Sequence, residues 1–195
     1  MMNFSEKVLK PSFLQGLVLL IGFGRVASGA PLDVRVTIGA DGKEHRFVRD
    51  TTFLQLGVAF RDERGLIWGD VVKKADGTFA QSGWLQAKEY CLSLNPEAER
   101  ARIKEEVEAG AEPETGIFLP LKQNFVALAR DLGSKSVETG EGYRVQASIS
   151  NLENWSWSAS PYAFDFAYGF DGRDGKVFYD FVANQHYYSI RCVAR

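Results

Sequence analysis

Few side chains in this 195-residue sequence could carry out covalent or acid–base chemistry. It has two histidines, His45 and His186, and two cysteines, Cys91 and Cys192. A hydrolase triad needs a base beside its nucleophile, so histidine is the scarce component here. His45 stands among charged neighbours in a predicted strand, and His186 in a predicted turn, without a second histidine or an acidic cluster at the spacing of metal ligands. We therefore expect both to be surface residues, and we predict no catalytic residue, no metal and no cofactor.

An acidic pair lies in the segment Asp-Gly-Arg-Asp-Gly, residues 171–175. Asp171 and Asp174 could work as an acid–base pair, or could bind calcium together with nearby carbonyl groups. The segment lacks the alternating acids and the closing glutamate of an EF-hand, and Asp and Gly are the residues that tight turns favour. We interpret it as a turn between strands and leave calcium binding open.

The first thirty residues have the pattern of a secretory signal. Lys7 and Lys10 precede an apolar run over residues 13–23, and small residues at 28–30 match a signal-peptidase site. The alternative is a short membrane anchor or a buried helix. Because the run is about a dozen residues and a bilayer span needs about 20, we predict export with cleavage after residue 30.

Residues 31–195 are predicted to form a single domain, since 45% hydrophobic and 25% charged residues are ordinary globular composition. Cleavage takes three basic residues and one acidic residue from totals of 23 and 25, which leaves a net charge of about −4. An acidic product without a basic run is unsuited to nucleic acid. No later segment is apolar enough to span a membrane, and the first cysteine, Cys91, is too far along for lipid anchoring.

Three helices are predicted from apolar spacing. The first covers residues 84–94 and turns Cys91 inward; the second covers 97–108, where we expect Asn95-Pro96 to supply the N-cap and the first-turn proline. The second is so charged that we interpret it as a solvated surface helix. The third opens at Pro120 and has an apolar stripe that ends at Leu132.

Strands are predicted on both sides of these helices. The N-terminal part indicates a hairpin and two further pieces, and the C-terminal part indicates an antiparallel meander in which residues 176–183, apolar on both faces, are central. The fold class is therefore α+β: an antiparallel sheet with two packed helices and one charged surface helix. The expected strands are 34–38, 45–48, 54–60, 65–68, 143–149, 155–158, 162–170, 176–183 and 187–193.

Several separated motifs resemble the Lcl C-terminal domain family, named after a bacterial collagen-like adhesin. The resemblance covers about residues 60 to 195 and implies a C-type-lectin-like fold, related to sulfatase-modifying-factor domains, with two helices flanking a twisted antiparallel sheet. The motifs that carry it are Gly-Leu-Ile-Trp (65–68), Trp-Leu-Gln-Ala-Lys-Glu-Tyr-Cys (84–91), Phe-Leu-Pro (118–120), Trp-Ser-Trp-Ser (155–158) and Ile-Arg-Cys-Val (190–193).

The chain departs from the family pattern in three places. Ile117-Phe118 stands where the family has Trp-Arg, an acid that usually follows on the next helix is replaced around Asn124, and the charged helix 97–108 resembles an insertion. The roles of the missing arginine and acid therefore do not transfer to this chain.

Cys91 and Cys192 match structural positions of the family. Independently of it, two cysteines in apolar patterns of an exported protein favour a disulfide. The alternative is two buried free thiols, which pack as small hydrophobic groups.

The sequence favours an exported, non-catalytic binding domain that recognises a glycan or an envelope protein, in the periplasm or outside the cell. The resemblance does not extend to calcium-lectin motifs, because residues 112–114 are out of place and 154–156 lack the acid. Two alternatives stay open: an enzyme related to the sulfatase-modifying oxidases, which would use a reactive thiol, and a structural subunit of an envelope assembly. The candidate ligand-binding residues, which could instead be core, are Trp155, Trp157, Tyr162 and Tyr187.

Overall fold

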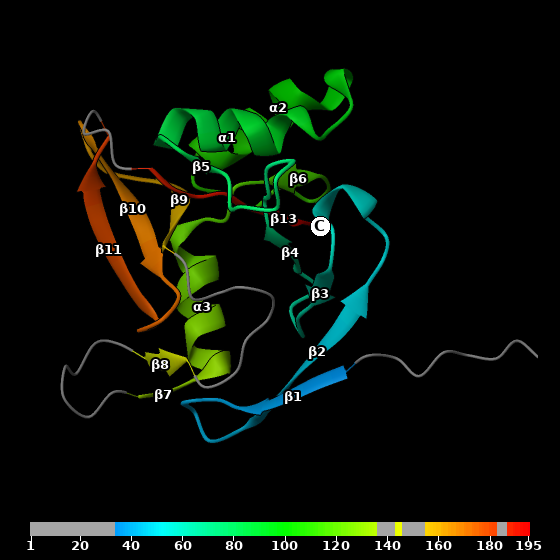
Figure 1. The fold of residues 1–195 in the computed structure, drawn as a ribbon, viewed down its shortest axis with the longest axis vertical. Helices are drawn as coiled ribbons and strands as arrows, with labels where there is room; N and C mark the ends of the chain where they lie inside the picture. Colours follow the sequence, from blue (N-terminus) through cyan, green and yellow to red (C-terminus); the bar gives the residue numbers. More distant parts are fainter. Residues whose placement is uncertain (1–33, 136–142, 146–154, 183–186) are drawn as a thin grey trace, which may run out of the picture. The chain divides into compact units, whose positions relative to one another are not determined.

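The computed structural model of the chain describes residues 34–135, 143–145, 155–182 and 187–195. All of these residues belong to one compact unit, Pro31–Arg195. Within the described ranges, three α-helices pack with two sheets of six and five strands (Figure 1). The predicted α+β class is therefore confirmed. The expected signal peptide and His186 lie outside the described residues.

The six-stranded sheet has the order β1-β2-β3-β4-β13-β6, and each neighbouring pair is antiparallel. Alternation along β2 places His45 and Phe47 inside, while Glu44 and Arg46 face solvent. The predicted N-terminal hairpin is confirmed as β1 and β2. The strands are β1 (Val34–Ile38), β2 (Glu44–Asp50), β3 (Ala59–Arg61), β4 (Ile67–Val71), β6 (Ile117–Phe118) and β13 (Arg191–Ala194).

The five-stranded sheet has the order β11-β10-β9-β12-β5. Strands β9, β10 and β11 form an antiparallel meander, of which the β10–β11 pairing was expected and the place of β9 beside β10 was not. A separate short pair joins β7 to β8. The strands are β5 (Gln81–Ser82), β7 (Gly133–Lys135), β8 (Tyr143–Val145), β9 (Trp155–Ala163), β10 (Phe166–Asp171), β11 (Lys176–Phe181) and β12 (Tyr188–Ser189).

Helix α3 (Lys122–Leu132) lies between the two sheets (Figure 1). The ring of Phe125 on its inner face stacks on Phe170 of β10, with centroids 4.6 Å apart, and also contacts Trp68 of β4 at 5.7 Å. All three rings are fully buried. One helical side chain therefore joins both sheets in a single core.

The last two strands of the chain, β12 and β13, connect the two sheets. Tyr188–Ser189 (β12) runs parallel to β9, and after Ile190 the chain passes into β13, which lies between β4 and β6. The predicted single strand over 187–193 is therefore divided between two sheets, and the expected meander does not extend to it. Gly69 permits the close approach of β4, because a Cβ there would lie 3.0 Å from the Cys192 carbonyl oxygen.

Helices α1 (Trp84–Ser93) and α2 (Glu97–Glu108) match their predicted extents and lie together at one end of the fold (Figure 1). Helix α2 buries only Ile103 and Val107, as expected of a charged surface helix. Its N-cap residue is Pro96 and not Asn95. The expected cap is absent because the Asn95 side chain is buried and bonded elsewhere.

Three further strand predictions were wrong. Residues 54–56 form a short 3-10 helix, η1 (Leu54–Leu56), before β3, and the predicted strand 162–170 contains the turn between β9 and β10. Among the described strands, β11 is at an edge of its sheet and not central, and its side chains stay partly exposed on both faces. Within the same ranges, no helix is long and apolar enough to cross a membrane.

Candidate functional site

The four predicted ligand-binding residues differ in exposure. Trp155, Tyr162 and Tyr187 are 47%, 49% and 54% exposed, whereas Trp157 is fully buried. The Trp157 ring contacts Tyr188 at 4.5 Å, and its indole N–H donates to the Ser82 carbonyl at 2.9 Å. Trp157 is thus a core residue, and its hydrogen bond connects β9 to β5.

Tyr162 belongs to a group of rings on one face of the outer strands, here called the tyrosine face and defined by Tyr162, Phe166, Tyr168 and Tyr179. The rings of Tyr162 and Tyr179 stack with centroids 4.2 Å apart and an interplanar angle of 8°. Phe166 and Tyr168 meet Tyr162 edge to face at 6.5 and 5.3 Å. These contacts hold half-exposed aromatic rings in fixed orientations.

A cation lies at the border of the tyrosine face. The ammonium of Lys122, the first residue of α3, stands 4.1 Å from the Tyr168 ring centroid. Phe164, in the turn between β9 and β10 and two residues after Tyr162, is fully exposed. The surface therefore combines flat rings, hydroxyl groups and one positive charge.

Trp155 lies on the opposite face of the same strands. Adjacent residues of a strand point to opposite faces, and Trp155 contacts Phe178 at 5.1 Å while Tyr179 belongs to the tyrosine face. The Tyr188 hydroxyl donates to Asp180 on the Trp155 side. Burial, together with this hydrogen bond and the Asp180 charge, raises the pKa of Tyr188, so its hydroxyl stays protonated. The structure thus does not bring Trp155 and Tyr162 into one site.

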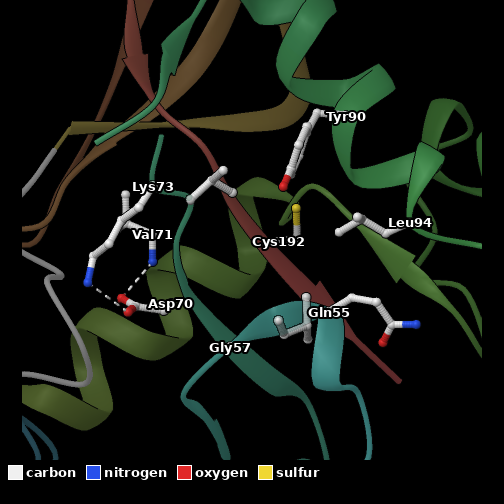
Figure 2. A pocket seen from close by; sticks show the side chains of 10 residues that line it. Gln55, Gly57, Asp70, Val71, Lys73, Tyr90, Leu94 and Cys192 are labelled. Carbon is white, nitrogen blue, oxygen red and sulfur yellow. Dashed lines mark hydrogen bonds and ion pairs between the residues drawn. The ribbon is translucent and has the colours of Figure 1, made fainter. Parts of the chain in front are cut away.

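A pocket of about 280 Å³ lies between η1, β4 and the end of α1, with Cys192 in its wall (Figure 2). Asp70 and Lys73 lie on one side, with the Lys73 ammonium 3.5 Å from the Asp70 carboxylate, and Tyr90 and Leu94 come from the opposite side. The backbone N–H of Val71 donates to Asp70 at 2.8 Å. Sequence reasoning missed this pocket, because its residues come from four separated segments.

The Cys91–Cys192 disulfide is formed, with Cα atoms 5.6 Å apart and a separation of 101 positions in sequence. It joins α1 to β13, and both cysteines are buried. The alternative of two free thiols is therefore excluded.

Arg191, beside Cys192, is a buried charged residue that the sequence did not single out. Its guanidinium donates to the Gly69 carbonyl at 2.5 Å, and burial lowers the pKa of Arg191 to about 10, against the opposing charge of Asp70. It thereby links β13 to β4 at residues that are next in sequence to the pocket residues Cys192 and Asp70.

His45 is buried and not a surface residue, contrary to the prediction. Its imidazole lies 3.0 Å from Asp41, 3.4 Å from Glu63 and 3.8 Å from Asp131, and Arg64 bonds Asp131 at 2.6 Å. Burial alone would lower the pKa of His45, but the hydrogen bond to Asp41 and the charges of Asp131, Asp41 and Glu63 raise it above 6.5. This charged group fastens the β1–β2 hairpin to the end of α3.

The acidic segment at residues 171–175 is a turn. The Asp171 carboxylate accepts hydrogen bonds from the backbone N–H groups of Arg173 at 2.9 Å and Asp174 at 3.4 Å. Gly175 closes the turn with a φ of +66°. In the described part of the chain, no group of three or more His, Cys, Asp or Glu side chains is placed to hold a metal ion.

No protein-family model, no curated protein and no solved structure matches this chain.

Proposed function

We propose that this chain is an exported, non-catalytic binding domain that recognises a glycan or a protein at the bacterial envelope or outside the cell. The observation that carries the proposal is the tyrosine face. Tyrosine rings combine a large apolar area with a hydroxyl that hydrogen-bonds, which suits them to sugar rings and to partner pockets. The stacking of Tyr162 on Tyr179 fixes the rings beforehand, so little side-chain entropy is lost on binding.

The disulfide supports the exported location. Disulfides form and persist in oxidising compartments and are rare in reducing ones. The bond between Cys91 and Cys192 is therefore compatible with passage through the predicted secretory route.

The same bond favours binding over oxidase chemistry. An enzyme related to the sulfatase-modifying oxidases would need a reactive thiolate. Cys91 and Cys192 are the only cysteines in the sequence, and each occupies the disulfide. A binding domain requires no such group.

We further propose that the chain is a divergent relative of the Lcl C-terminal domain with a C-type-lectin-like fold. In support, the motifs that suggest the family converge on β13. Val193 pairs with Trp68 of β4 on one side and with Phe118 of β6 on the other, and Cys192 is bonded to Cys91 of α1. An experimental structure whose strand order does not superpose on C-type-lectin-like domains would contradict this proposal.

The binding proposal is tested with the mature protein on a glycan array and against solubilised envelope proteins. We expect the variant Tyr162→Ala/Tyr179→Ala to lose the binding that wild type shows. Tyr187→Ala, at an equally exposed tyrosine outside the tyrosine face, is the matched control and should keep it. An empty screen at high protein concentration, or equal loss in both variants, would contradict the proposal.

A further inference from the structure

We propose that the pocket between η1, β4 and α1 is a second binding site, which takes a small neutral polyol of the size of one sugar ring. It shares no residue with the tyrosine face and does not rest on the function proposed for that face. Three properties of the pocket indicate the ligand: its charged side chains, its apolar wall and its volume.

The charged groups of the pocket favour a ligand without net charge. The charged side chains that line the pocket, the Asp70 carboxylate and the Lys73 ammonium, lie 3.5 Å apart on the same wall and have opposite signs. The charge of Arg191 also acts on Asp70, but Arg191 is fully buried and does not line the pocket. An anion here would meet the carboxylate, and a cation would meet the ammonium. A hydroxyl group can donate to the carboxylate and accept from the ammonium, so adjacent hydroxyls of a sugar match both partners. Gln55 at the rim adds an amide that both donates and accepts.

The opposite wall suits the apolar face of a sugar ring. Tyr90 and Leu94 of the α1 end approach from that side (Figure 2). Leu56 of η1 is a further apolar residue of the lining. Tyr90 offers both a ring surface and a hydroxyl. The disulfide ties this part of α1 to β13, so the two walls are held in place before a ligand arrives.

The size of the pocket limits the ligand to one ring. Its volume of about 280 Å³ is just below the range of about 300–1,000 Å³ for sites that hold drug-sized molecules. Gly57 lines the rim. Its φ of +68° makes any other residue strained there.

The test is saturation-transfer NMR of the mature protein with a panel of neutral monosaccharides: glucose, galactose, mannose, N-acetylglucosamine and N-acetylgalactosamine. We expect at least one of them to give a signal. Lys73→Met should weaken its binding about tenfold, the effect of losing one charged hydrogen bond. Lys74→Met is the matched control, since Lys74 is an exposed neighbour outside the pocket, and should leave binding unchanged.

Two further variants separate this site from the tyrosine face. Tyr179→Ala should leave monosaccharide binding intact, and Gln55→Ala, at an exposed rim position, should weaken it. Because Lys73 and Gln55 are exposed, both variants should unfold at the wild-type temperature. No signal from any sugar, equal effects of Lys73→Met and Lys74→Met, or loss of the signal in Tyr179→Ala would overturn the proposal.

Discussion

The side chain of Asn95 bonds both backbone polar groups of Ile117. Its Nδ2 donates to the Ile117 carbonyl at 2.6 Å, and its Oδ1 accepts from the Ile117 N–H at 2.7 Å. Nδ2 also donates to the Leu92 carbonyl at 3.1 Å, near the end of α1. The Asn95 side chain thus makes the hydrogen bonds that a neighbouring strand would make with Ile117 of β6, and it connects β6 to the end of α1.

We expect Asn95→Ala to lower the free energy of unfolding by about 2–4 kcal/mol, because it leaves two buried backbone groups of β6 without their partner. Urea denaturation of the variant measures this. Ser93→Ala is the control, since Ser93 is exposed and its hydroxyl donates only to the Tyr90 carbonyl. A loss below about 0.5 kcal/mol for Asn95→Ala would contradict the role given to this side chain.

Removal of the disulfide should destabilise the fold strongly. The loop closed by Cys91 and Cys192 spans 101 residues, for which the chain-entropy model gives up to about 4.7 kcal/mol. We expect Cys91→Ser/Cys192→Ser to lose stability of this order in chemical denaturation. A reductant should shift the wild-type transition and leave the double variant unchanged. Equal transitions for wild type and the double variant would refute the prediction.

Phe125→Ala should be far more costly than a truncation on the tyrosine face. Phe125 is fully buried between the two sheets, so its truncation leaves a cavity. The free energy of unfolding should fall by about 3–5 kcal/mol. Tyr179→Ala removes a ring that is more than half exposed and should cost less than about 1 kcal/mol. Thermal and urea unfolding of both variants give the comparison. Similar losses in the two variants would mean that the tyrosine face is part of the core.

Stability should depend on pH through His45. Because its pKa is higher in the folded chain than the unfolded value of 6.5, the stabilisation is fully present below about pH 6.5 and is lost as the pH rises through the raised pKa. The difference in unfolding free energy between wild type and His45→Gln should therefore shrink between pH 6 and pH 9. An NMR titration of His45 reads its pKa directly. A difference that stays constant or grows over this range would contradict the prediction.

The helices and the disulfide could be predicted from the sequence because their signals are local. Helix α3 has a regular apolar stripe, and the two cysteines lie in apolar patterns of the sequence. The division of residues 187–193 between two sheets has no such local signal. It is determined by which strands are near, and β4, β6 and β9 come from separated parts of the chain.

The buried polar groups could not be predicted for the same reason. In β1 the apolar residues Val34, Val36 and Ile38 face solvent, while Thr37 is buried and donates to the Asp131 carbonyl of α3 at 2.7 Å. The apolar alternation of β1 would place the valines and the isoleucine inside. The contact of Thr37 with α3 instead buries the other face of the strand. The burial of His45 could not be predicted for the same reason. Its partner Asp131 lies 86 positions later in the sequence, and the residue pattern of the hairpin contains no sign of it.

The position of β13 at the end of the chain determines when, during synthesis, the fold can be completed. Until residue 194 leaves the ribosome, β4 and β6 have no strand between them and Cys91 has no partner. Contacts between such distant positions form slowly, since the whole intervening chain must be closed into a loop first. The six-stranded sheet and the disulfide can therefore be completed only after nearly the whole chain has been made.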